Sequence, residues 1–473
     1  MSFLVSSLVL RLSSMVLFIL VARRLGEQAT GTYSLASTYT LIFMSLSFWG
    51  LDQLFVRDVS QHRELAGKYW INFGLLRLLL ACAVIALLYA FLTVLGKYPQ
   101  DTIRLIMLMG LTLIPDGLDN MCQAYFMAIE EMLYIPLASL ALAVFRLAGI
   151  AVVVMCGTVT VETVIWVFLV ASAARGAASV WLVLRKLTPA SFDLDPSLWL
   201  RSIAWAFPFV FIASFIALEA QMGVVITSLL ATEREVGLYG AAQNLVVALQ
   251  MIPQAFQVAV FPAMSRLHAR DAKSFQLLYR QSFFYLLVAS LGLISCVIIV
   301  ARDLIVFLYK QPFAPATSSL QILAISIVFS FLNIPNSRLM IIVNQQRRLA
   351  IFLGLGLVGN LIVSLALIPR FGFEMAAVGK VVSMLVFFSA NSLFVHRNVL
   401  RARLAPRVAR IPVALGASIC VDFLLLRHSA LPLMVVALVG LIVYAGVLIA
   451  TNAFPQEDVQ LFRRLLRTEA NVR

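Results

Sequence analysis

ARRLGEQATGTYSLA is the sequence of residues 22–36, and it has an echo in EREVGLYGAAQNL at residues 233–245. In both stretches a charged turn leads into Gly-x-Tyr, then into small residues and a long apolar segment. Gly31 aligns with Gly237 at an offset of 206 residues. We therefore predict that the chain contains two copies of one helical bundle, with the functional site between them.

The composition is that of a membrane protein. Of 473 residues, 62% are hydrophobic and 12% are charged, and the mean hydropathy is +0.98. Apolar runs of about 20 residues, the length that spans a bilayer, follow one another with short breaks. The first run, 3–22, lacks a basic leader and precedes Arg23-Arg24, so we expect a retained helix rather than a signal peptide. Its abrupt start suggests that a few upstream residues are missing from the gene model.

We predict an all-α polytopic membrane protein of about fourteen transmembrane helices. A second echo relates residues 114–120 to residues 334–340, so spans 1–6 match spans 7–12 in the same orientation. Two six-helix lobes related by a pseudo-two-fold axis along the membrane normal are expected, with two appended helices. The spans are 3–22, 33–56, 70–95, 103–127, 133–155, 163–184, 202–230, 236–261, 282–301, 318–343, 349–369, 375–396, 411–426 and 430–452. The domains are 1–187 (first lobe), 188–201 (cytoplasmic linker), 202–400 (second lobe), 401–452 (appended helices) and 453–473 (basic tail).

The Lys and Arg residues predict the orientation. Loops on the side of the N-terminus, together with the tail, carry 21 of them, and loops on the opposite side carry 9. The positive-inside rule therefore predicts that both termini are cytoplasmic. The net charge of +14 reports this topology and does not indicate nucleic-acid binding.

Motifs for metal or nucleotide chemistry are lacking in the sequence. The five cysteines lie in or beside apolar runs and form no CxxC pair, and the few histidines show no metal-ligand spacing. No P-loop is present. We expect neither an enzyme nor an ATP-driven pump, and no metal or cofactor other than a coupling H⁺ or Na⁺.

Charged residues inside the predicted spans are the candidate functional residues, because a charge at the bilayer centre usually faces a bundle interior or a wet cavity. Six are basic and five are acidic, so the two signs nearly balance. Each has an alternative to a role in a cavity. Snorkelling to the membrane surface is the alternative for the charges toward span ends, which are Arg11, Arg77, Asp52 and Arg338. A structural ion pair is the alternative for the mid-span charges. The eleven are Arg11, Arg77, Arg146, Arg175, Arg338, Lys380, Asp52, Asp116, Asp119, Glu219 and Asp422.

Polar residues recur at helical spacing in five spans, which places each set on one helix face. Polar glue between helices explains one such stripe. Five stripes, in equivalent spans of both halves, favour a shared aqueous lumen. Their members are Ser7, Arg11 and Ser14; Ser34, Thr38, Ser45 and Asp52; Thr112, Asp116, Asp119, Asn120 and Gln123; Gln243, Gln250, Gln254 and Gln257; and Ser326, Ser330, Asn333, Ser337 and Asn344.

Several short motifs resemble the polysaccharide-transporter or oligosaccharide-flippase family of the multidrug/oligosaccharidyl-lipid/polysaccharide exporter superfamily. They are the opening stretch, GLDQ at 50–53, EVGLYGAAQNL at 235–245, FPAMSRL at 261–267 and LIPRFG at 367–372. The resemblance covers about residues 1–400. It implies two lobes around a central cavity, alternating access, and movement of an undecaprenyl-pyrophosphate-linked glycan from the inner to the outer leaflet of a bacterial inner membrane.

The resemblance also implies roles for the intramembrane charges. Lumen bases would hold the diphosphate and acidic sugars, and here those bases are Arg11, Arg77, Arg146, Arg175, Arg338 and Lys380. Glu219, Asp116 and Asp119 are the candidates for binding a coupling ion. The expected partners are the lipid-linked glycan, membrane lipids, and a glycan polymerase or glycosyltransferases of the same pathway. One alternative is a cation-coupled multidrug exporter of the same superfamily. Another is a membrane-embedded glycan polymerase or ligase, but the short outer loops disfavour an enzyme of that kind.

Overall fold

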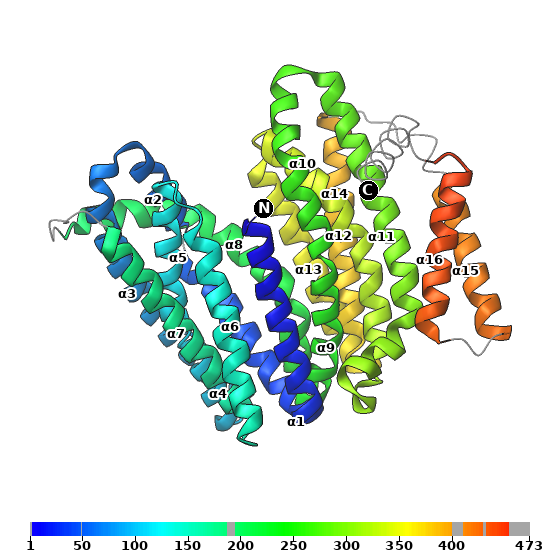
Figure 1. The fold of residues 1–473 in the computed structure, drawn as a ribbon, viewed down its shortest axis with the longest axis horizontal. Coiled ribbons are helices and arrows are strands. Elements are labelled where there is room, and N and C mark those ends of the chain that lie inside the picture. The colour runs from blue at the N-terminus through cyan, green and yellow to red at the C-terminus, as the bar shows by residue number, and fades with distance from the viewer. Residues whose placement is uncertain (1, 49, 187–193, 400–409, 429–431, 454–473) are drawn as a thin grey trace, which may run out of the picture.

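The computed structural model describes residues 2–48, 50–186, 194–399, 410–428 and 432–453. These residues form helices and no β-strand, which confirms the all-α prediction (Figure 1). Ten helical segments among them are long and apolar enough to cross a membrane, and two shorter apolar helices follow near the C-terminus. The predicted basic tail lies outside the described residues, and so does most of the arginine-rich segment 397–410 between the last span of the second lobe and the appended helices.

The first lobe contains α1 to α7. Figure 1 shows α1 starting between the lobes, running to the lower end of the molecule and turning back there. We use "upper end" for the end where α1 begins and "lower end" for the opposite one. The bounds are α1 Ser2–Phe48, α2 Leu51–Gln61, α3 Ala66–Leu95, α4 Gln100–Gly110, α5 Leu113–Ala128, α6 Tyr134–Met155 and α7 Val161–Lys186.

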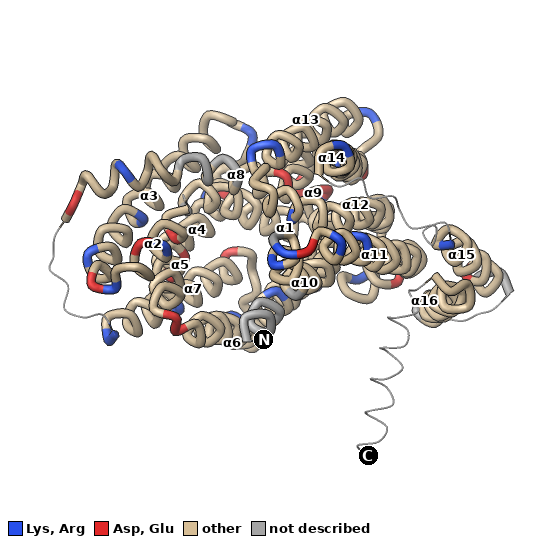
Figure 2. Tube along the Cα trace, turned by 90° about the horizontal axis from the view of Figure 1, so that it is seen from above, with Lys and Arg blue, Asp and Glu red and all other residues tan. Residues whose placement is uncertain are grey.

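The second lobe contains α9 to α14, and α8 connects the two lobes. The pair α15 and α16 packs on the outer side of α11, away from the first lobe (Figure 2). The bounds are α8 Pro196–Leu230, α9 Glu233–Leu249, α10 Met251–Arg270, α11 Ala272–Tyr309, α12 Ala316–Ile342, α13 Gln346–Phe371, α14 Met375–Asn398, α15 Ile411–His428 and α16 Leu433–Ala450. Helix α8 thus begins inside the segment 188–201 expected as a linker.

The second predicted span, 33–56, is wrong at its end. Helix α1 ends at Phe48, and Gly50 adopts a left-handed conformation (φ 64°), which breaks the helix. The following α2 is amphipathic and buries Leu54, Phe55 and Val59 on one face. A short helix of this kind lies along a membrane surface rather than crossing it.

Prolines interrupt two spans that the sequence predicts as single helices. A proline cannot donate to the carbonyl four residues earlier, which loosens the preceding turn. Pro115 follows the break between α4 and α5, and Pro253 follows the break between α9 and α10 at Gln250. Pro335 is the counterpart of Pro115 in the second lobe, but it lies inside an unbroken α12. The two lobes therefore share topology but differ in local geometry.

The two halves meet at the lower end through the glycines of the repeated motif. A Cβ on Gly31 would lie 1.8 Å from the carbonyl oxygen of Glu233 and 3.1 Å from the amide nitrogen of Gly237. A Cβ on Gly237 would lie 2.0 Å from the carbonyl oxygen of Glu27 and 2.9 Å from the amide nitrogen of Gly31. Since Glu27 and Glu233 share the same 206-residue offset, these contacts are reciprocal. They are the contacts expected across a pseudo-two-fold axis.

Polar bonds surround this glycine contact. Arg234 forms an ion pair with Glu27 at 3.2 Å, and Thr102 donates to Glu233 at 2.8 Å. Arg23 donates to the backbone carbonyl of Leu308 at 2.6 Å. Each of these bonds joins the first lobe to the second. The lobes are therefore closed against each other at the lower end, and they spread apart toward the upper end (Figure 1).

Gly31→Ala tests this contact. The added methyl group cannot fit beside the Glu233 carbonyl without displacing backbone, and overpacking of this kind costs about 1–3 kcal/mol. We expect a lower thermal midpoint in detergent. We also expect faster thiol labelling of a cysteine placed at the fully buried Thr30, in a background without the native cysteines.

Gly74→Ala is the matched control, because a Cβ at Gly74 in α3 has no neighbour within 4 Å. It should keep or slightly raise the midpoint, since alanine favours a helix. Equal midpoints and labelling rates for the two variants would show that the lobes do not depend on this contact.

Candidate functional site

A cavity of about 320 Å³ lies between the lobes, and helices of both lobes line it. We call it the central cavity. Apart from one arginine and one aspartate, its polar lining is neutral. Four of the five predicted polar stripes contribute, and the stripe on α12 does not. The polar lining residues are Ser14, Ser34, Ser37, Thr38, Thr40, Thr112, Asp116, Arg146, Gln221, Gln243 and Asn244.

Arg146 projects from α6 and is the basic residue of the central cavity. Its guanidinium group lies 4.2 Å from the ring centroid of Phe168 on α7, and this cation–π contact orients it. Its buried Nε atom has no hydrogen-bond partner, and no acid lies within ion-pair distance among the described residues. Arg146 therefore retains donors for a ligand.

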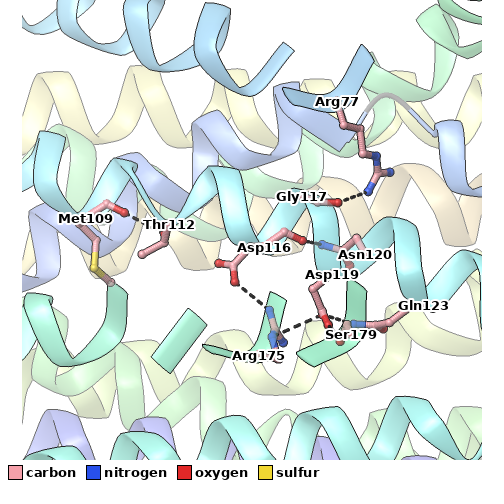
Figure 3. Close-up of polar contacts among 10 residues, drawn as sticks. All are labelled: Arg77, Met109, Thr112, Asp116, Gly117, Asp119, Asn120, Gln123, Arg175 and Ser179. Carbon is pink, nitrogen blue, oxygen red and sulfur yellow. Dashed lines mark hydrogen bonds and ion pairs between the residues drawn. The ribbon is translucent and has the colours of Figure 1, made fainter. Parts of the chain in front are cut away.

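Arg175 on α7 is committed to two carboxylates of α5 (Figure 3). It donates to Asp116 at 2.7 Å, and its Nε lies 3.4 Å from Asp119. Asp119 is fully buried and also accepts from Ser179 and Gln123, at 2.7 and 2.6 Å. Such buried charges are tolerated only when paired and hydrogen-bonded. The second carboxylate leaves this group with one excess negative charge, which Arg146 nearby balances.

Arg77 on α3 is also paired. It is 1% exposed, donates to the backbone carbonyl of Gly117 at 2.9 Å and forms an ion pair with Asp52 of α2 at 2.5 Å. Figure 3 shows it on the side of α5 opposite Arg175. Burial this complete excludes the snorkelling alternative for Arg77. The residue instead ties α2 and α3 to the middle of α5.

A comparable buried pair joins α8 to the second lobe. Lys380 on α14 donates to the Glu219 carboxylate at 2.5 Å and to the Glu219 backbone carbonyl at 3.0 Å. Glu219 lies on α8, and both side chains are nearly buried. The pair fixes α8 to the second lobe, two residues before Gln221 enters the central cavity.

Arg11 and Arg338 have no acidic partner among the described residues. Arg11 is exposed on α1, one helical turn above Ser14 of the central cavity. Arg338 on α12 lies 5.1 Å from the ring centroid of Phe261 and lines a small separate pocket with Gln257. The six predicted bases thus form two groups: Arg77, Arg175 and Lys380 are paired with acids, and Arg11, Arg146 and Arg338 are not.

Several residues of the central cavity lie outside the predicted stripes, among them Ser37 and Thr40 of α1. Phe168 orients Arg146, Gln221 lines the cavity from α8, and Asn244 presents an amide Nδ2 that has no hydrogen-bond partner. The signals for the two amides were present, since Asn244 follows Gln243 and Gln221 lies near Glu219. Among the described residues, no group of three His, Cys, Asp or Glu side chains could hold a metal ion.

The division into paired and unpaired bases predicts different stabilities. Arg175→Ala should destabilise the protein by about 3–5 kcal/mol, because it leaves the buried carboxylate of Asp119 uncompensated. Arg146→Ala should lower the thermal midpoint in detergent less than Arg175→Ala does, because no carboxylate lies within ion-pair distance of Arg146 among the described residues. Arg175→Ala combined with Asp116→Asn and Asp119→Asn should recover much of the loss, because no buried charge remains. A similar midpoint for the two single variants would contradict this division.

The sequence matches one protein family. The family model described as "Polysaccharide biosynthesis protein" matches residues 1–268, more than half of the chain. No curated protein sequence matches it.

Solved structures share the fold. The lipid II flippase MurJ, in an inward closed conformation, superposes with a TM-score of 0.77 at 12% identity, over 98% of this chain and 99% of that chain. An inward-facing multidrug resistance MATE transporter of the MOP superfamily gives 0.67 at 12% identity, over 81% and 93%. A mutant of the Vibrio cholerae MATE transporter VcmN gives 0.60 at 15% identity, over 84% and 96%. The chain therefore belongs to the polysaccharide biosynthesis protein family, and it has the two-lobed fold of the flippases and transporters of this superfamily.

Proposed function

We propose that the protein moves an undecaprenyl-pyrophosphate-linked oligosaccharide from the inner to the outer leaflet of a bacterial inner membrane by alternating access. The central cavity binds the diphosphate. Arg146 supplies the positive charge, and the amide of Asn244 and the hydroxyl group of Thr40, which has no hydrogen-bond partner, supply further donors. Guanidinium groups match phosphate geometry and hold it with charge-assisted hydrogen bonds.

The main support for this proposal is a difference between the two charged residues of the central cavity. Asp116 forms an ion pair with Arg175. Arg146 stacks on Phe168 and forms no ion pair with the described residues, although Asp116 lies in the same cavity. The site is therefore ready to receive an anion. A binding site for cationic drugs requires the reverse arrangement, an acid with no basic partner.

The multidrug exporter is the second candidate, and the pairing disfavours it. Asp52, Asp116, Asp119 and Glu219 all face a base. Asp422 is buried without a basic partner among the described residues, but it lies on α15, outside the central cavity. No acid in the cavity remains available for a cationic ligand.

The shape is consistent with an inward-facing stage of transport. By the positive-inside rule the upper end faces the cytoplasm, so both termini are cytoplasmic and the closed lower end faces outward. A volume of about 320 Å³ holds a diphosphate but not an oligosaccharide, so the glycan extends toward the upper end. Delivery to the outer leaflet then requires that the contact between Gly31 and Gly237 opens. Enzymes that assemble or polymerise the glycan act before and after this step.

We further propose that the pair of Glu219 and Lys380 couples transport to a proton or Na⁺. The pair links α8 to α14 and lies close to Gln221 of the central cavity. Neutralising Glu219 releases Lys380 and frees α8 to move relative to α14. Asp116 and Asp119 offer the corresponding exchange with Arg175 in the first lobe.

Arg146→Ala should block glycan export and cause lipid-linked oligosaccharide to accumulate in a strain that lacks the native gene. Losing a hydrogen-bonded charge to the diphosphate weakens binding about 10–100-fold. Arg146→Lys should retain partial export, because it keeps the charge without the forked geometry. Arg104→Ala removes a well-exposed arginine of the first lobe and serves as the control. Normal export by Arg146→Ala, at normal membrane levels, would refute the binding role.

Glu219→Gln together with Lys380→Met tests ion coupling, since removing both charges avoids a lone buried ammonium group. In vesicles loaded with lipid-linked glycan, this double variant should transport at a rate that no longer responds to an imposed pH or Na⁺ gradient. Its thermal midpoint shows whether it has folded. A folded double variant with native gradient dependence would dismiss this pair as the coupling site.

A further inference from the structure

A second pocket, of about 370 Å³, lies at the upper end between α2, α3 and the start of α8. We call it the upper pocket. It contains three bases and two acids, so it carries a net positive charge, and it also contains two aromatic side chains and a serine. These residues are Arg57, Lys68, Arg201, Asp58, Asp195, Tyr69, Trp205 and Ser202.

Two of the three bases are committed to the two acids. Arg57 donates to Asp58 at 2.8 Å, and Lys68 lies 3.0 Å from Asp195. Hydrogen bonds from Ser197, Lys68 and the Leu198 amide hold the pKa of Asp195 at about 2, so this acid stays ionised. Both pairs are partly exposed and therefore contribute little on their own.

Arg201 and Ser202 are not committed. Arg201 is exposed and makes no hydrogen bond or ion pair with the described part of the chain. The Ser202 side chain lines the same pocket and is only 2% exposed, yet its hydroxyl group has no hydrogen-bond partner. A buried polar group without a partner is rare in a native structure and calls for a ligand or an ordered water. The upper pocket therefore presents a cation and a buried donor side by side.

The surroundings place this pocket at head-group depth. Tyr69 and Trp205 line it, and Trp199 lies one turn from Ser202 on α8. Aromatic residues of this kind gather where a membrane meets water. Helix α2, whose apolar face is buried in the protein, lies beside them along the same surface. A ligand reaching the pocket is therefore the head group of a membrane lipid rather than a soluble anion.

We propose that the upper pocket is a binding site for the phosphate-bearing head group of a membrane lipid. Arg201 and the Ser202 hydroxyl donate to the phosphate oxygens, with Arg57 and Lys68 adding positive charge at the rim. A bound phosphate joins α2 and α3 of the first lobe to α8, and so holds the start of α8 in place. The inference extends the proposed function, because the diphosphate of the substrate and an anionic phospholipid both carry this chemistry.

Binding is measured by native mass spectrometry of the full-length protein, titrated with undecaprenyl diphosphate, phosphatidylglycerol or diacylglycerol. Both phosphate lipids should bind, and diacylglycerol, which lacks phosphate, should not. In an Arg146→Ala background, which removes the positive charge of the central cavity, Arg201→Ala and Ser202→Ala should each lower the apparent affinity for the phosphate lipids about tenfold. Without added lipid, Ser202→Ala should match the native thermal midpoint, because no hydrogen bond is lost.

Arg270→Ala is the matched control, since it removes an exposed arginine from the same end of the molecule but outside the pocket. It should leave the affinity unchanged. Preference for undecaprenyl diphosphate would identify a loading site for the substrate, and preference for phosphatidylglycerol would identify a site for a resident lipid. Native affinity in both pocket variants, or an equal loss in Arg270→Ala, would overturn the proposal.

The same titration with Arg146→Ala separates the two proposals. Binding at the upper pocket should persist in this variant, because Arg146 lies in the central cavity. If the pocket variants bind lipid normally but export still requires Arg146, the lipid site is refuted and the proposed function stands. If the pocket variants lose lipid binding but Arg146→Ala exports normally, the proposed function is refuted and the lipid site stands.

Discussion

The close approach of two glycine backbones, Gly31 on α1 and Gly237 on α9, is the constraint on which the arrangement of the two lobes depends. No side chain fits between these helices, since each Cβ would meet a carbonyl oxygen of the partner helix at about 2 Å. Close packing of this kind is bistable, because the helices either make contact or separate by more than a methyl group. A transporter that alternates between two faces needs such a contact. Here this contact holds the lobes together at the lower end.

The buried charges are the second constraint. A charge inside the bundle must find either a partner or a ligand, because the cost of leaving it unpaired is several kcal/mol in practice. Three pairs meet this demand inside the protein, and they join α2 to α3, α5 to α7 and α8 to α14. What remains in the central cavity is Arg146, supported by a cation–π contact and by the excess carboxylate of the Arg175 group. In the proposed function substrate recognition would therefore rest on few residues, because most of the charge inside the described helices is engaged in ion pairs.

The sequence contained the fold but only part of the site. The 206-residue repeat, the apolar runs and the stripes on α1, α5 and α9 predicted two lobes and many of the cavity residues. The ends of the second span were missed, because Gly50 breaks a run that composition alone leaves continuous. Ion pairing was an alternative for the mid-span charges, but which residues pair could not be predicted, for a different reason. Asp52 and Arg77 lie 25 residues apart, and Glu219 and Lys380 lie 161 residues apart, so only tertiary packing brings them together. Helical spacing shows which face a residue occupies but does not show which partner lies opposite.

Helix α8 is where these constraints meet, because it is attached to both lobes. In the second lobe it is held by the nearly buried pair of Glu219 and Lys380, and removing one partner of such a pair costs about 3–5 kcal/mol. The start of α8 is held to the first lobe by Asp195 and Lys68, which are each about 30% exposed, and by hydrogen bonds from Asp195 and Trp199 to Asn72. An exposed pair contributes about 0–1 kcal/mol. When the lobes move, this attachment of the start of α8 should therefore yield before the pair of Glu219 and Lys380 does. A phosphate head group in the upper pocket would strengthen the weaker attachment, which makes lipid occupancy a means of setting when the lobes rearrange.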